Sequence, residues 1–159
     1  MSAKISLDER SKAEGFLRRV VLAPWRAGAQ GPEAYDCWGL ARAAQRELGG
    51  RDLPVVNADP ADLRTVIRLV ADHPMRAEWE EVATPQHLDL VLMAHSRHLS
   101  HIGVWLALDG GIVLHATEQF TRDGRSAADK PGVTADSLQG LRLQGFSRIQ
   151  FMRHREAMA

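Results

Sequence analysis

Apolar positions in the first half of the chain recur every three to four residues, which is the spacing of one face of a helix. Ser6, followed by Glu9, fits a capping box, and Asp36 is a good N-cap for the next apolar stripe. Asp59-Pro60 begins a third stripe, because aspartate caps a helix and proline is tolerated in its first turn. The sequence therefore predicts three helices, over residues 6–22, 36–48 and 59–73.

The pattern changes to that of β-strands from residue 79 onward. Branched and aromatic residues fill short runs bounded by turn residues, and the predicted strands cover 88–93, 101–108, 112–116 and 146–152. Residues 109–111 are a turn signal, 121–132 are expected to form a loop, and 153–155 are expected to be a solvated basic tail. Helices followed by an antiparallel sheet predict an α+β domain.

Composition and charge limit the number of domains and the classes of partner that we expect for this protein. A chain of 159 residues, 45% apolar and 25% charged, can bury one core but not two, so we expect a single domain over residues 1–159. Twenty Lys and Arg balance 20 Asp and Glu, which gives no general attraction to nucleic acid or to anionic lipid. No apolar run approaches the ~20 residues of a membrane span, and the polar start does not fit a signal peptide. We therefore expect neither membrane insertion nor export.

Cys37 is the one cysteine of the chain, so it can form no intrachain disulfide. In the first turn of the second predicted helix, its sulfur would meet unpaired N–H groups and the positive end of the helix dipole. Both favour a thiolate and a lowered pKa, and the same N–H groups could bind a developing oxyanion. The alternative is that Cys37 is a small buried apolar residue.

Two histidines on neighbouring predicted strands could serve that thiol. His101 could be a general base, and His115 could fix its ring orientation; alternatively, each only lines a strand. Both positions are odd, so they share a sheet face only if the hairpin loop has an odd number of residues. A three-residue loop sets His115 opposite Trp105 and leaves His101 ~13 Å away. A longer loop centred near Leu108, or a bulge, would bring the histidines level.

A metal site is the competing interpretation of His95, His98 and His101, which are spaced every third residue. No helix is predicted there to place them on one face, and no acidic or thiol partner stands beside them. We therefore expect no metal site and no cofactor.

Three short motifs, in order along the chain, resemble those of the NlpC-type cysteine peptidases, which are papain-like cell-wall hydrolases. They are Asp36-Cys37-Trp38-Gly39-Leu40, Ser100-His101-Ile102-Gly103-Val104-Trp105 and Leu114-His115-Ala116. Residues 88–92 also resemble the Gly-Asp-Leu-Val strand of that family, and the match covers roughly residues 20–118. The resemblance implies a papain-like fold in which Cys37 is the nucleophile, His101 the general base and His115 the orienting residue.

The implied substrate is the peptidoglycan stem peptide, often cut between D-glutamate and diaminopimelate. Many members carry a tyrosine at the oxyanion site about a dozen residues before the cysteine, where this chain has Trp25. The resemblance places Tyr35, Asp36, Trp38 and Ser100 at the substrate or oxyanion site as well.

Trp38 follows the cysteine, where many members have a small residue, as in a branch associated with phage tail tips and tail assembly. This branch implies tail-tip partners and a protein made in the cytoplasm that acts from a virion or after lysis. Two alternatives are a structural tail component with a vestigial site and an acyltransferase that uses the same Cys–His pair.

Overall fold

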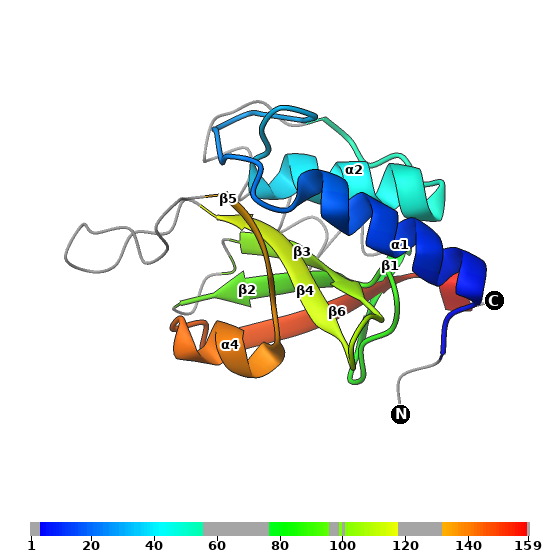
Figure 1. Ribbon diagram of the computed structural model, residues 1–159. Coiled ribbons are helices and arrows are strands. Elements are labelled where there is room, and N and C mark those ends of the chain that lie inside the picture. The colour runs from blue at the N-terminus through cyan, green and yellow to red at the C-terminus, as the bar shows by residue number, and fades with distance from the viewer. Residues whose placement is uncertain (1–3, 56–76, 96–98, 100, 118–131, 159) are drawn as a thin grey trace.

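The computed structural model describes residues 4–55, 77–95, 99, 101–117 and 132–158 (Figure 1). Its elements, in chain order, are α1 (Leu7–Val20), α2 (Cys37–Gly49), β1 (Trp79–Val82), β2 (Leu90–Ala94), β3 (His101–Leu106), β4 (Ile112–Thr117), β5 (Gly132–Asp136), α4 (Leu138–Leu143), β6 (Arg148–His154) and a 3-10 turn, η2 (Arg155–Met158). Helices packed on an antiparallel sheet confirm the predicted α+β class. The helix predicted over residues 59–73 lies outside the described residues.

The first two helices begin at the predicted caps. The Ser6 hydroxyl accepts from the Glu9 N–H at 3.1 Å while the Glu9 carboxylate accepts from the Ser6 N–H at 2.8 Å, which completes the capping box. The predicted end of α1 is wrong by two residues, because Val21 is already extended and Leu22 has a φ of 71°. Helix α2 ends at Gly50, whose φ of 66° suits glycine.

The sheet has six strands in the order β1-β6-β2-β3-β4-β5, and every neighbouring pair is antiparallel. The C-terminal strand β6 therefore lies between β1 and β2 rather than at an edge. The prediction of a solvated basic tail is wrong for Arg153 and His154, because both residues belong to β6. The Arg153 guanidinium donates two hydrogen bonds, of 2.9 and 2.7 Å, to the buried carboxylate of Asp89.

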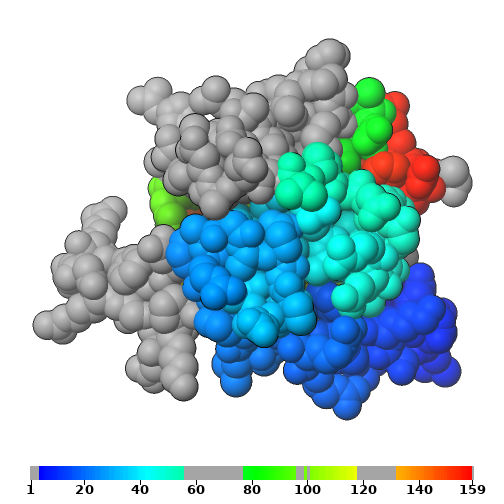
Figure 2. Space-filling model, turned by 90° about the horizontal axis from the view of Figure 1, so that it is seen from above, coloured from blue at the N-terminus to red at the C-terminus, as the bar shows by residue number. Residues whose placement is uncertain are grey.

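Two apolar cores cover the two faces of the sheet. Helices α1 and α2 lie over one face (Figure 1), and seen from above they and the segment between them cover it (Figure 2). Buried members of this core include Phe16, Leu40, Leu92, Val104 and Leu114. Helix α4 covers the other face, where the buried members are Val91, Met93, Trp105, Val113, Leu141 and Phe146. No helix in the described part of the chain is long and apolar enough to cross a membrane.

Candidate active site

Cys37 occupies the first position of α2, and Asp36 fixes this helix start. One Asp36 oxygen accepts from the Gly39 N–H at 2.6 Å, and the other accepts from the Gly28 N–H at 3.0 Å. A Cβ at Gly39 would collide with the Ala29 carbonyl, so only glycine lets the preceding loop lie this close to the helix. The loop and the cap together hold Cys37, which is 5% exposed, against the sheet.

The β3–β4 hairpin sets the relative positions of the two histidines. The last pair before the turn is Leu106 with Ile112, so the loop covers residues 107–111. The prediction of an odd-length loop is confirmed, whereas the three-residue register is wrong. The turn residues Asp109, Gly110 and Gly111 all have positive φ, and they extend the loop beyond the predicted tight turn.

With this register, His115 lies opposite Gly103, and His101 is its diagonal neighbour on the same sheet face. The missing side chain of Gly103 leaves the space between the two histidines open: a Cβ there would lie 3.2 Å from the His115 Cβ and 2.8 Å from a Val113 methyl. The His101 Nε2 therefore reaches the His115 Nδ1 at 2.8 Å, and the two ring planes meet at 73°. This contact is the histidine pair expected from the sequence.

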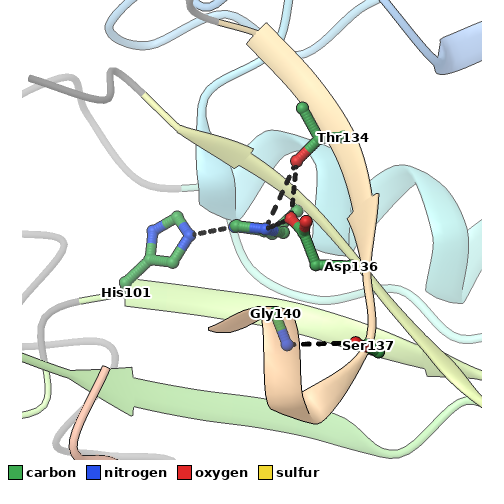
Figure 3. Close-up of polar contacts among 6 residues, drawn as sticks. His101, Thr134, Asp136, Ser137 and Gly140 are labelled. Atoms are coloured by element: carbon green, nitrogen blue, oxygen red, sulfur yellow. Dashed lines mark hydrogen bonds and ion pairs between the residues drawn. The ribbon is translucent and has the colours of Figure 1, made fainter. Parts of the chain in front are cut away.

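Asp136 and Thr134, both on β5, extend this contact (Figure 3). The Asp136 Oδ2 lies 2.7 Å from the His115 Nε2 and accepts a hydrogen bond of 2.9 Å from the Thr134 hydroxyl. This hydroxyl also lies 3.4 Å from the same histidine nitrogen. Sequence reasoning missed both residues because β5 was not predicted, although the alternation of Thr134 and Asp136 places them on one strand face.

A gap in the β3–β4 ladder brings the Cys37 sulfur to the start of β3. The Trp105 N–H donates to the Asp89 carbonyl, and the Trp105 carbonyl accepts from the Leu88 N–H, so the backbone groups of Trp105 face β2. Successive residues of a strand turn these groups to alternate sides, and Ile102 lies three residues before Trp105. The Ile102 N–H therefore faces β4. There the pairing with β4 begins only at Val104. The Ile102 N–H instead interacts with the Cys37 sulfur. The thiol therefore lies beside the residue that follows His101.

The resting site carries no charge on the thiol or on the base. Burial raises the pKa of Cys37 to about 12, and the Asp36 carboxylate adds to this effect. Backbone N–H groups, including that of Ile102, lower the pKa of Cys37, but by less than burial raises it. The prediction of a net lowering of this pKa is therefore wrong, because desolvation outweighs the N–H groups. Burial also holds the pKa of His101 well below its usual range, and His115 and His95 act in the same direction.

The rings of His95 and His101 share one aromatic neighbour. The His95 ring stacks on Phe146, with centroids 4.1 Å apart, and His101 stacks on the same phenyl ring. In the described part of the chain, no three His, Cys, Asp or Glu side chains gather closely enough to hold a metal ion. His98 lies outside the described residues.

The other residues expected at the site lie around the start of α2. Trp38 is 1% exposed and its indole N–H donates to the Pro54 carbonyl at 2.8 Å, so its donor is engaged within the fold. Tyr35 is buried and packs on Gly31, and the half-buried Trp25 pairs with Tyr35 in an isolated bridge. Ser100 lies outside the described residues. Substrate contact by these side chains stays a prediction.

Comparison with known protein families gives a match. The model of the NlpC/P60 family matches residues 23–139, a segment that contains Cys37, His101, His115 and Asp136. Among curated proteins, none matches this sequence. Members of the matched family are generally cysteine peptidases or amidases of the cell wall. Because the match covers well over half of the sequence, the chain belongs to the NlpC/P60 family.

Proposed function

We propose that this protein is a cysteine peptidase that hydrolyses an amide bond in the peptidoglycan stem peptide, of the D-glutamyl–diaminopimelate type. The observation that carries the proposal is the hydrogen-bonded pair of His101 and His115, together with the N–H of the next residue, Ile102, which lowers the pKa of the Cys37 thiol. A nucleophile, a base and an orienting residue are the groups that acyl transfer through a thiol requires.

The reaction begins when His101 takes the thiol proton, because both groups are neutral at rest. The thiolate of Cys37 then attacks the amide carbon, and N–H groups at the start of α2 stabilise the oxyanion. The imidazolium of His101 returns its proton to the departing amine, which breaks the carbon–nitrogen bond and leaves a thioester. Water, deprotonated by His101, attacks the thioester, releases the carboxylate product and restores the thiol.

We also propose that the protein belongs to a phage tail, acts from the virion or after lysis, and binds other tail-tip proteins. The support is the sequence Asp36-Cys37-Trp38-Gly39-Leu40, which resembles the tail-associated branch. The structure adds that Trp38 fills core space beneath residues 53–54, where a small residue would leave a void.

A second candidate function is a structural component whose thiol does no chemistry. One observation favours it: Cys37 is 5% exposed and burial raises its pKa, as expected of an inert buried cysteine. The hydrogen-bonded histidines and Asp136 favour the enzyme, since buried polar side chains arranged in series have no evident packing advantage over apolar ones.

The deciding experiment is mass spectrometry of purified stem peptides and muropeptides after incubation with the protein. We expect a new fragment pair from the wild type and none from Cys37→Ala or His101→Asn, with unchanged circular dichroism. His154→Asn is the matched control, because it removes a histidine from β6, which β2 separates from β3, and should leave cleavage intact. Equal cleavage by wild type and Cys37→Ala would reject a thiol mechanism, and no cleavage by the wild type would favour the structural component. Addition of an amine nucleophile distinguishes hydrolysis from acyl transfer.

A further inference from the structure

Asp136 lies at the end of β5 (Figure 3), and its carboxylate contacts the histidine pair at the His115 Nε2. We propose that Asp136 is a positioning residue that fixes the tautomers of His115 and His101, so that the base keeps an unprotonated Nδ1. The inference rests on the proposed function of the same site, and it concerns the residue that prepares the base rather than the bond that is cleaved.

For two neutral imidazoles, the hydrogen-bond chemistry gives a single consistent assignment of protons. An ionised carboxylate only accepts, so the His115 Nε2, 2.7 Å from Asp136, carries the proton and donates. In a neutral imidazole the other nitrogen is then an acceptor, so the His115 Nδ1 accepts from the His101 Nε2 at 2.8 Å. Because the neutral His101 has its proton on Nε2, its Nδ1 keeps the lone pair that a general base needs.

Several contacts hold the carboxylate in its ionised form and in this place. The hydrogen bond from His115 is the largest cause that lowers the pKa of Asp136, and the Thr134 hydroxyl adds to it, against a smaller opposing effect of burial. In the strand register, His115 pairs with Thr134, so Asp136 is its diagonal neighbour on the same face. The next residue, Ser137, caps α4 by accepting from the Gly140 N–H at 3.0 Å, which fixes the end of β5.

Strand β5, which was not predicted from the sequence, therefore has a function, because it carries the hydrogen-bond acceptor of His115. Without the Asp136 carboxylate as acceptor, neutral His115 could carry its proton on either nitrogen. If the proton were on Nδ1, this N–H would point at the N–H on the His101 Nε2, and two donors would face each other. His101 would then have to move its own proton to Nδ1, where it blocks removal of the thiol proton. His115 is fully buried, so water does not compensate for a lost partner.

The first test needs no substrate. Nitrogen-15 NMR of the histidine rings distinguishes the two neutral tautomers, and we expect both His101 and His115 of the wild type to carry their protons on Nε2. In Asp136→Ala, we expect His101 to populate the Nδ1-protonated form. Asp136→Asn retains an oxygen acceptor and should keep the wild-type tautomers. Asp52→Ala, which removes an exposed aspartate after α2, is the matched control.

The second test measures cleavage of the muropeptide substrate by the same variants. We expect Asp136→Ala to lower kcat about 10- to 100-fold with little change in KM, and Asp136→Asn to recover part of the loss. Nδ1-protonated His101 in the wild type, or unchanged tautomers and kcat in Asp136→Ala, would overturn the proposal. If Asp136→Ala does not fold, the wild-type tautomers together with the same tautomer change in Asp136→Leu, which removes the acceptor but keeps the side-chain volume, decide it. If the wild type shows the expected tautomers but cleaves no muropeptide, the peptidase function is rejected and the positioning role of Asp136 still holds.

Discussion

The imidazole of His101 lies nearly parallel to the phenyl ring of Phe146, with 13° between the planes and 5.5 Å between the centroids. Phe146 is buried, and its ring also meets His115 edge-on at 6.3 Å. A hydrogen bond from one ring nitrogen fixes where that nitrogen lies but still allows the ring to tilt. The flat contact with Phe146 limits this tilt, so the phenyl ring and His115 together determine the orientation of the base.

We predict that Phe146→Leu lowers kcat about 10- to 100-fold, because a branched aliphatic side chain fills the volume but gives the imidazole no flat surface. The free energy of unfolding should fall by about 1–2 kcal/mol, as for other large-to-smaller changes in a core. Muropeptide kinetics and urea denaturation measure the two effects separately.

The control for this variant is Phe151→Leu. Phe151 belongs to the same core cluster but meets Trp105, 6.0 Å away, and touches neither histidine of the pair. We expect a similar loss of stability and an unchanged kcat. Equal losses of kcat in the two variants would show that Phe146 acts through general packing alone.

Gly103 carries a second prediction. Gly103→Ala introduces a Cβ that meets the Leu114 carbonyl at 2.9 Å and the His115 Cβ at 3.2 Å, and the backbone atom cannot move aside cheaply. We expect the free energy of unfolding to fall by about 1–3 kcal/mol and cleavage to be lost, since the two histidines are pushed apart. Thermal denaturation and the histidine NMR shifts measure these effects.

Gly15→Ala is the comparison for a glycine without such a contact. Among the described residues, no atom outside the backbone of α1 itself and the two chain neighbours lies within 4 Å of a Cβ at this position, so the substitution should raise stability by about 0.5–1 kcal/mol through helix propensity. If Gly103→Ala behaved like Gly15→Ala, the hairpin would have room for a side chain and the close approach of β3 and β4 would not matter for the pair.

The parts of the fold that could be predicted from sequence are those with local signals. Helices α1 and α2 carry caps within the sequence, and β2, β3 and β4 are apolar runs bounded by turns. Strands β1 and β5 and helix α4 were not predicted, because they have four, five and six residues and mixed polarity. Such elements form only when the rest of the sheet supplies their partners.

The residues of the candidate site also fall into those with a local signal in the sequence and those without one. Cys37, His101 and His115 stand in short motifs that are visible in the chain, whereas the roles of Asp136 and Phe146 depend on long-range pairing and packing. The direction of the Cys37 pKa shift was predicted wrongly for a related reason. Helix position is a local property, but burial under the rest of the fold is not, and here burial has the larger effect.

The raised pKa of Cys37 predicts slow alkylation of the native protein by iodoacetamide. A pKa of about 12 against an ordinary 9.0 means about a thousandfold less thiolate at neutral pH. The rate should rise about tenfold for each pH unit through pH 10, and the protein unfolded in guanidinium should react far faster at pH 7. A native rate that reaches its plateau below pH 7 would mean that the resting site holds a thiolate after all.

The same shift links the thiol to stability. Because the pKa is higher in the folded state, the neutral thiol favours folding fully below about pH 9, and this contribution disappears as the pH rises through about 12. Cys37→Ala should therefore lose less stability than the wild type between pH 8 and pH 11. Parallel curves for the two proteins over this range would contradict the raised pKa.

The pair of Arg153 and Asp89 carries the last prediction. The side chains are 11% and 2% exposed, so water screens their charges little, and Arg153 also donates to the Thr84 carbonyl at 2.9 Å. Arg153→Ala leaves the Asp89 carboxylate buried with the Gln86 N–H as its one remaining donor among the described residues, and we expect it to cost about 3–5 kcal/mol of stability.

A double-mutant cycle separates this pair from the packing around it. Arg153→Ala/Asp89→Ala should cost about 1–3 kcal/mol less than the sum of the single variants, because the double variant leaves no buried charge behind. Arg10→Ala, which breaks the half-exposed pair with Glu14 on α1, should change the free energy of unfolding by no more than about 0.5 kcal/mol. Urea denaturation measures all four variants. If the Arg153 cycle showed no coupling, the link between β6 and the start of β2 would depend on strand pairing alone, and Arg153 would belong with the solvated residues after all.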